Sequence, residues 1–380
     1  MAHKKKTTKK RPAKQAGRKL AGKKKTAISS MKQQTSKLHR EMNLDCLRAS
    51  LQLALELEFA TIPPYLCALW SIKDDLHPAA RSIREVVQEE MLHMALACNM
   101  LASIGGEPKI SASVPTYPGP LPGGVHPGLE AKLSGLTKES LQDFMWIERP
   151  PHVIPHKHAY EEPALHANLE VLEQQENAAD DTIGEFYAMI KKAFLKINPK
   201  MCPDHQISGP LAWSVIRNLD DMERAIDLIT EQGEGSGHSP EDSAGDLSHF
   251  YRFLEVHEEV RLVWDPLNRE LSTGKSLKFP ETLPMAVVPE GGYCCKHLEG
   301  LREELQRKVD YYLKEFDKSY TQLVDQLQSA WTLGGQGSLV KSYCTMFQLE
   351  KSAKPLMEIE RPNMNGQTYG PCFRYIGDAK

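Results

Sequence analysis

The sequence predicts an all-α protein built on a four-helix bundle. Many segments repeat apolar residues at the three- and four-residue spacing of a helix face, and few alternate apolar and polar residues for long. Acidic residues and histidines recur in a set pattern on four of the expected helices. The 380 residues are 41% hydrophobic and 26% charged, which is typical of a globular chain with a sizeable core.

The bundle helices are expected in order along the chain, at residues 43–69, 78–104, 178–196 and 246–262. Pro63 and Pro64 are expected to kink or break the first of them. The second ends before Gly105 and Gly106, a common stop signal. Four further helices are expected at residues 138–147, 220–231, 297–333 and 339–357.

Composition divides the chain into three parts. Residues 1–40 hold 15 Lys and Arg and no acidic residue, which leaves 32 basic against 50 acidic residues in the rest. This tail is poor in apolar residues and is expected to be disordered. Residues 41–290 are expected to form the bundle. Residues 291–380 are expected to form a helical extension packed on it, closed by an extended segment, RPNMNGQTYGPCFRYIG.

Charge and cysteine content limit which binding partners and which cellular compartment are expected. The basic tail indicates binding to a nucleic acid or another polyanion. Alternatively, it is a solubilising extension, or one that docks on the chain's own acidic body. No apolar run approaches the roughly 20 residues of a membrane span, and no secretory signal opens the chain. The eight cysteines form no CxxC pair, so reduced thiols in the cytoplasm are expected. The sequence is compatible with an oligomer.

Two of the bundle helices carry an acid and a histidine three residues apart. The pairs are Glu90 with His93 in EEMLH, and Asp246 with His249 in DLSH. Residues at this spacing share a helix face, so each pair can bind one metal ion. With 50 acids and 14 histidines, about two such pairs arise by chance, so neither pair is specific by itself.

The other two bundle helices carry single glutamates on apolar faces. Glu58 lies between Leu57 and Phe59, and Glu185 precedes Phe186. Acids are rarely buried unless they are paired or bind a metal. The order single, pair, single, pair is that of carboxylate-bridged dimetal bundles. The sequence therefore predicts a site for two iron ions, or for manganese.

Local alternatives exist on three helices. Glu56 and Glu58 cannot both face one site, because two positions differ by about 200° around a helix. Glu58 is preferred because it continues the apolar stripe. Glu90 is preferred over Glu89 because only Glu90 has the three-residue spacing to a histidine. Glu255 lies well round the helix from Asp246 and is expected to support the site or the fold.

Residues 107–178 form a long excursion rich in Pro and Gly, which is typical of a functional lid. Its histidines are expected to be exposed rather than to bind a second metal: His152, His156, His158 and His166. Trp146 and Tyr160 are expected to shape a substrate pocket, and Arg149 or Lys157 to pair with a substrate carboxylate.

With these residues in view, the sequence resembles the ferritin-like family of iminophenylpyruvate dimer synthases from violacein- and indolocarbazole-type pigment biosynthesis. The resemblance covers about residues 45–260 and is carried by LELEFATIPPYLCALWSI, EVVQEEMLHMALACNMLASIGGEP, LPGGVHPGLEAKLSGLTKESLQDFMWIERP, TIGEFYAMI, EQGEGS and LSHFYRF; the closing GPCFRY also fits. It implies a ferritin-like bundle with metal ligands at Glu58, Glu90, His93, Glu185 and His249. Asp246 departs from the Glu expected there, and the lysine-rich tail is not part of the pattern.

These observations lead us to expect a non-haem di-iron oxidoreductase that acts on a small organic substrate, such as an amino-acid-derived imine or keto acid. The pigment enzymes are much longer chains, so their reaction does not transfer directly. One alternative is a non-enzymatic ferritin-like protein that handles iron or binds a polyanion. Another is a scaffold whose buried acids serve only in ion pairs.

Overall fold

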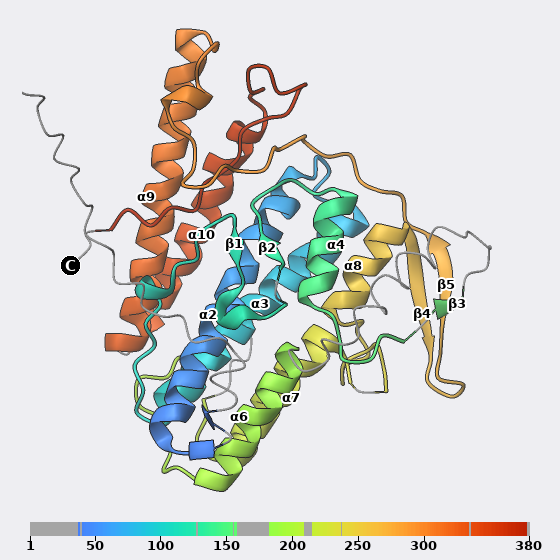
Figure 1. Cartoon of the computed structure of the whole chain (residues 1–380), viewed down its shortest axis with the longest axis vertical. Coiled ribbons are helices and arrows are strands. Elements are labelled where there is room, and N and C mark those ends of the chain that lie inside the picture. The colour runs from blue at the N-terminus through green and yellow to red at the C-terminus, as the bar shows by residue number, and fades with distance from the viewer. Residues whose placement is uncertain are drawn as a thin grey trace, which may run out of the picture.

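The computed structural model describes residues 37–377 except 39, 127, 155, 158–181, 209–214, 237, 334 and 335. Eight α-helices dominate the described chain and the strands are short, which confirms the all-α prediction (Figure 1). No helix among the described residues is long and apolar enough to cross a membrane. All eight cysteines are free thiols.

The central pair of helices is α2 (Leu44–Ser71) and α3 (Pro78–Ser103), which pack along their length (Figure 1). The Asn43 side chain caps α2 by accepting from the Cys46 amide. The predicted break at the prolines is wrong, because α2 runs through both. Pro64 cannot donate to the Ala60 carbonyl, and the Tyr117 hydroxyl donates to it instead over 2.7 Å. A neighbouring segment thus satisfies an acceptor that the proline leaves open.

A second pair, α6 (Ile183–Ile197) and α7 (Leu219–Glu234), lies alongside the first and completes the bundle (Figure 1). A third pair, α4 (Lys138–Ile147) and α8 (His249–Glu258), packs next to the bundle. The sequence prediction had made α8 the fourth bundle helix and α7 an accessory one. The structure gives the bundle position to α7 and makes α8 a helix of 10 residues.

The expected helix at residues 246–262 is too long at both ends. Glu259 adopts a left-handed conformation that ends α8, and β4 (Val260–Asp265) follows at once. The Asp265 carboxylate accepts from the amides of Leu267 and Asn268, and this turn leads into β5 (Glu270–Ser276). β4 and β5 pair antiparallel, and β3 (His156–Lys157) pairs parallel with β5.

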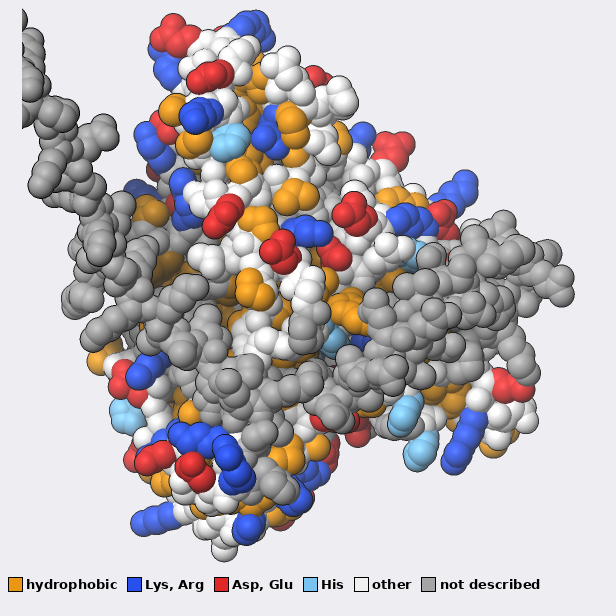
Figure 2. Space-filling model, viewed as in Figure 1, with side chains coloured by type: hydrophobic (Ala, Val, Ile, Leu, Met, Phe, Trp, Pro, Cys, Tyr) orange, Lys and Arg blue, Asp and Glu red, His pale blue; other side chains and the backbone are white. Residues whose placement is uncertain are grey.

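Beyond the bundle, α9 (Glu303–Leu333) and α10 (Gln336–Met357) form a helical hairpin (Figure 1). The expected C-terminal cap is present: the Phe373 ring stacks on Trp70 of α2 at 6.0 Å, and Arg374 pairs with the buried Asp317 of α9. Short elements complete the described chain: β1 (Gly119–Pro120), β2 (Glu130–Ala131), and single 3₁₀ turns at Ser111–Ser113, Pro122–Gly124 and Cys295–His297. Acidic and basic side chains are interspersed over the upper end of the α9–α10 hairpin (Figure 2).

Several sequence predictions concern residues that the structure does not describe. They are the lysine-rich segment 1–36 and the loop residues Tyr160, His158 and His166. The side chains of His156 and Lys157 are likewise outside the described part. His152 is exposed, and Arg149 lies over the Trp146 ring at 5.1 Å.

Candidate metal centre

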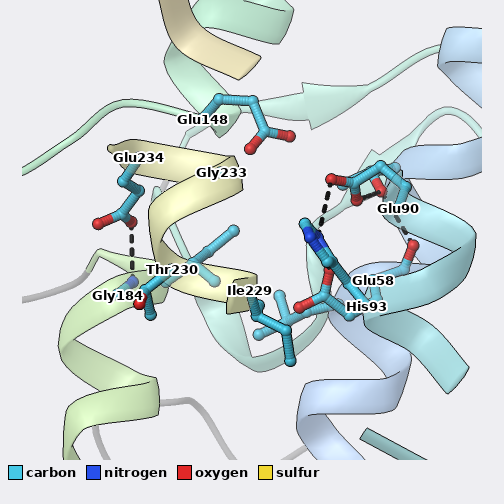
Figure 3. A pocket seen from close by; sticks show the side chains of 12 residues that line it. Glu58, Glu90, His93, Glu148, Gly184, Ile229, Thr230, Gly233 and Glu234 are labelled. Atoms are coloured by element: carbon cyan, nitrogen blue, oxygen red, sulfur yellow. Dashed lines mark hydrogen bonds and ion pairs between the residues drawn. The ribbon is translucent and has the colours of Figure 1, made fainter. Parts of the chain in front are cut away.

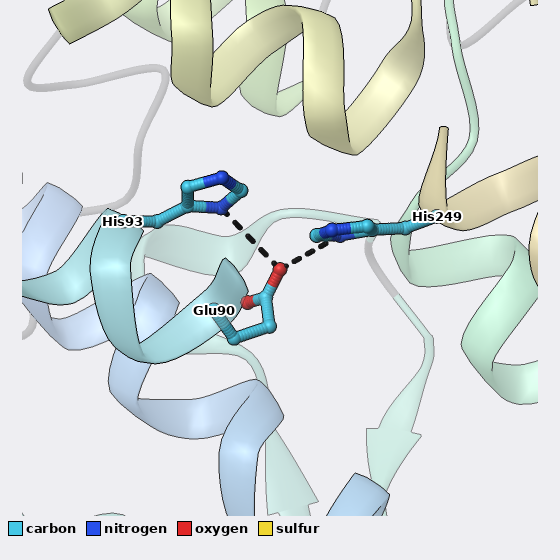
Figure 4. Close-up of side chains that lie close together, drawn as sticks. All are labelled: Glu90, His93 and His249. Atoms are coloured by element: carbon cyan, nitrogen blue, oxygen red, sulfur yellow. Dashed lines mark ion pairs between the residues drawn. The ribbon is translucent and has the colours of Figure 1, made fainter. Parts of the chain in front are cut away.

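Four of the predicted site residues meet in the interior. Glu58 comes from the middle of α2, Glu90 and His93 from α3, and His249 from the first position of α8; each is at most 4% exposed. His93 Nδ1 lies 3.5 Å from Glu90 Oε1 and 3.7 Å from Glu58 Oε2. His249 Nδ1 lies 2.9 Å from the same Glu90 oxygen (Figure 4). Both imidazoles therefore converge on one carboxylate.

Two further glutamates, which the sequence prediction missed, complete the cluster. Glu148, at the C-terminal cap of α4, places Oε2 3.6 Å from His249 Nδ1. Glu234, the last residue of α7, lies across a small cavity from Glu58, Glu90 and His93 (Figure 3). Both carboxylates are buried. The cavity has a volume of about 20 Å³, which is room for a water-sized molecule.

The structure corrects the predicted positions of Glu185 and Asp246. Glu185 is exposed because α6 turns the neighbouring Phe186 and Tyr187 inward instead. Asp246 is exposed and precedes α8, in a turn where its amide donates to Asp242. A three-residue spacing puts two side chains on the same face only when both residues lie in one helix. Asp246 lies outside α8, so its spacing to His249 gives no reason to expect a shared metal.

Burial and contacts distinguish the other pairs of alternatives. Glu58 is buried, whereas Glu56 is partly exposed and accepts from Gln52 and Ser113. Glu90 faces the cluster and Glu89 contacts the outer side of His249. Glu255 has a structural role, since it accepts from Arg261 and from the Leu262 amide and so joins α8 to β4.

Each of the four buried carboxylates accepts one hydrogen bond from outside the cluster. The donors and distances are Tyr187 to Glu58 at 2.6 Å, Tyr65 to Glu148 at 2.6 Å, Thr61 to Glu90 at 2.5 Å, and the Gly184 amide to Glu234 at 2.8 Å. A Cβ at position 184 would lie 2.2 Å from Glu234 Oε2, so any other residue there would make the carboxylate shift. One oxygen of each group is thus anchored, and the second oxygens of Glu58, Glu90 and Glu148 face the histidines.

The outer nitrogens of both histidines are also engaged. His93 Nε2 lies 2.9 Å from Gln232 Oε1, and His249 Nε2 lies 3.0 Å from Glu89 Oε2. Oxygen acceptors at these positions favour the tautomer with the proton on Nε2, which leaves a lone pair on Nδ1. Both lone pairs then face carboxylate oxygens, and the buried His249 Nδ1 makes no well-directed hydrogen bond. Such an arrangement needs a cation or protons between the groups, and it fits a metal.

Without a metal, the site has to hold protons. Burial raises the pKa of Glu58 and of Glu148, and it raises the pKa of Glu234 to about 8. Burial alone would lower the pKa of His93, but its contacts with Glu58 and Glu90 outweigh this and raise the pKa to about 10. Burial disfavours ionised Glu90 too, yet its close contacts with the two histidines outweigh this and lower its pKa. Metal ions that enter the cluster would replace these protons.

The comparisons with known proteins identify the family. A family model described as ferritin-like matches residues 51–258, more than half of the chain. The chain belongs to the ferritin-like family. Its structure is similar to the crystal structure of a ferritin-like protein from Caulobacter vibrioides, with a TM-score of 0.57 and 20% identity over 87% of this chain and 98% of that one. At that identity the likeness concerns the fold. A search of curated proteins finds no match.

The ferritin-like match covers all six buried cluster residues. Glu148 and Glu234 escaped the sequence analysis because they stand at helix ends, where no apolar periodicity marks a buried face. One signal was present: Glu148 lies in WIERP and Glu234 in EQGEGS, and both segments belong to the family resemblance. The cluster keeps the predicted inventory of four acids and two histidines, with Glu148 and Glu234 where Glu185 and Asp246 were expected.

Proposed function

We propose that this ferritin-like chain is a non-haem dimetal oxidoreductase. The observation that carries the proposal is the convergence of two imidazole Nδ1 atoms on Glu90 Oε1, with both Nε2 atoms engaged on the outside. A histidine that binds a metal through one ring nitrogen typically donates a hydrogen bond from the other nitrogen to an oxygen in this way. An ion pair network without metal would leave His249 Nδ1 poorly satisfied.

The proposal assigns two metal positions to the cluster. The His93 position is bounded by Glu58, Glu90 and His93, and the His249 position by Glu90, Glu148 and His249. Glu90 belongs to both and would hold both ions. Glu234 lines the cavity across from Glu58, Glu90 and His93 (Figure 3). Four carboxylates balance the charge of two divalent ions.

The donor set favours iron, with manganese second. Carboxylate oxygens suit hard cations, and imidazole suits iron. Iron held here would supply one-electron redox chemistry toward dioxygen or peroxide. The chain's own groups hold the carboxylates in place, through Tyr65, Tyr187 and Thr61, and keep the site out of bulk water. In the metal-free protein, Glu234, whose pKa burial raises to about 8, can hold a proton beside the cavity at neutral pH.

The substrate proposal comes from the family resemblance: a small organic molecule such as an amino-acid-derived imine or keto acid. The test is oxygen uptake by protein loaded anaerobically with Fe(II), with and without such compounds. Uptake that rises with a substrate and is lost in Glu90→Gln supports the proposal. Equal uptake with every compound tested would contradict the substrate class.

One observation favours a second function, iron handling without an organic substrate. The cavity of about 20 Å³ admits a water-sized molecule but not an imine or keto acid. Under this alternative, the loaded protein oxidises successive additions of Fe(II) and retains more than two ions per chain. An oxidoreductase retains two and needs the organic substrate for turnover.

The basic tail supports a separate proposal of polyanion binding, since residues 1–40 hold 15 basic and no acidic residues. An electrophoretic shift of DNA that persists at moderate salt and disappears when residues 1–36 are removed would support it. Absence of a shift at low salt would contradict it. The metal content should be the same with and without the tail.

A further inference from the structure

The two histidines of the cluster differ in what holds their outer nitrogens. His93 Nε2 meets the neutral amide of Gln232, whereas His249 Nε2 meets the carboxylate of Glu89. Glu89 Oε2 also lies 3.1 Å from Arg252 Nη1, so it is held in an ion pair beside the histidine. The outer acceptor is therefore an ion-paired carboxylate for His249 and a neutral amide for His93.

Arg252 is itself fixed with respect to His249. It lies one turn further along α8, its side chain is 9% exposed, and its Nε donates to the Leu247 carbonyl over 2.5 Å. Arg252 thereby orients Glu89, and Glu89 orients the imidazole. A carboxylate acceptor makes an imidazole a stronger electron donor than an amide acceptor does, and it holds the ring more firmly.

The cavity adds a second asymmetry. Glu58 and His93 of the His93 position line it, and of the groups that bound only the His249 position Glu148 lines it. Glu90 and Glu234 complete the acidic lining. In the described part of the chain, His249 and Glu89 do not line it. The histidine with the neutral outer partner is therefore the one whose ring borders free space, whereas the His249 position meets the cavity only through carboxylates.

We infer that Glu89 and Arg252 are positioning residues that make the His249 position the tighter metal position, and that the His93 position is the one that small molecules reach. This rests on the proposed function, because it requires metal in both positions. It assigns different tasks to the two: one ion anchors the site, and the other meets the oxidant or a small anion.

The test is a cobalt(II) titration of the metal-free, full-length protein, followed by visible absorption and by competition with a chelator. The wild type is expected to give two separate binding constants. Glu89→Gln should weaken the tighter step by about 10- to 100-fold and change the weaker step little. Gln232→Glu should strengthen the weaker step and bring the two constants together. One variant removes a negative charge beside His249 Nε2, and the other adds a negative charge beside His93 Nε2.

Glu85→Gln is the matched control. Glu85 lies 3.9 Å from Arg252 Nη1, its side chain is 53% exposed, and Glu89 stands between this pair and His249. Both constants should stay as in the wild type. Azide added to the fully loaded protein should change the absorption that appears with the second equivalent of cobalt, and leave that of the first.

The outcomes separate the two proposals. A wild type that binds no cobalt, iron or manganese would overturn the proposed function and this inference with it. Two bound ions with equal constants, or constants that Glu89→Gln and Gln232→Glu leave unchanged, would overturn the inference alone. Azide acting on the first equivalent would overturn the assignment of the open position. If Glu89→Gln does not fold, the binding constants of Gln232→Glu and the azide experiment still test the inference.

Discussion

The two halves of the candidate metal centre are built differently. Glu58, Glu90 and His93 lie in the interiors of α2 and α3, two long helices packed along their length. The other half comes from helix ends: Glu148 caps α4, Glu234 is the last residue of α7, and His249 is the first of α8. Both halves are equally buried, so the difference lies in how the backbone positions them.

Helix interiors fix side-chain directions by their own periodicity, whereas helix ends depend on where the chain turns. Gly235, with φ +83°, ends α7 directly after Glu234, and a turn held by Asp242 precedes α8. The helix-end half therefore owes its geometry to loops and to contacts with distant residues. The helix-interior half should tolerate changes in the loops, and the helix-end half should not.

The largest effect is expected from the residue that joins the two halves. Glu90→Gln removes the carboxylate on which both histidines converge, so both metal positions should empty. Elemental analysis after loading should fall from two ions per chain to nearly none. Glu185→Gln, which changes an exposed acid on α6, is the control and should retain two. Two retained ions in Glu90→Gln would contradict the bridging role.

A variant in the helix-end half alone should lose one of the two metal ions. Glu148→Gln alters the His249 position alone and should leave one ion per chain. Asp246→Asn, in the exposed turn before α8, should retain both. The opposite pattern, with metal lost from Asp246→Asn and kept in Glu148→Gln, would restore the ligand that the sequence suggested and refute the structural assignment.

This contrast also explains what sequence reasoning reached. The long helices, the buried face of Glu58 and the Glu90–His93 pair were predictable because local periodicity determines them. His249 was found for an incorrect reason, since its supposed partner Asp246 lies outside the helix. Glu148 and Glu234 could not be found by periodicity, because tertiary packing alone turns these helix ends inward. The β4–β5 hairpin was missed because a single short pair of strands gives a weak alternating signal.

The protonation of Glu234 gives a pH test of the helix-end half. Its pKa is about 8 in the folded, metal-free protein and near 4.5 when unfolded. Between these values the folded state binds a proton that the unfolded state releases. The free energy of unfolding should therefore fall as pH rises from about 5 to 8, by up to about 1.4 kcal/mol per pH unit.

Glu234→Gln should flatten this dependence in denaturant titrations of the metal-free protein. Metal affinity should show the opposite trend and strengthen as pH rises, because fewer protons compete for the ligands. An unchanged slope in Glu234→Gln would show that Glu234 is not the group that titrates.

The smallest effects are expected from the two tyrosines. Tyr187→Phe removes the donor to Glu58, and Tyr65→Phe removes the donor to Glu148. Each should cost about 1–3 kcal/mol in the stability of the metal-free protein, because a buried carboxylate oxygen loses its partner. Metal affinity should fall further in Tyr65→Phe, since the helix-end Glu148 has less backbone restraint. Equal losses would show that the two halves are equally rigid.

The central claim is that this ferritin-like chain holds two metal ions between four carboxylates and two histidines. The most direct measurement is the metal content of the wild-type protein after anaerobic loading with Fe(II) and removal of free metal. The account predicts two iron ions per chain, and two manganese ions when Mn(II) replaces iron. Protein that retains neither metal would contradict it and would leave the six buried side chains as an ion-pair network.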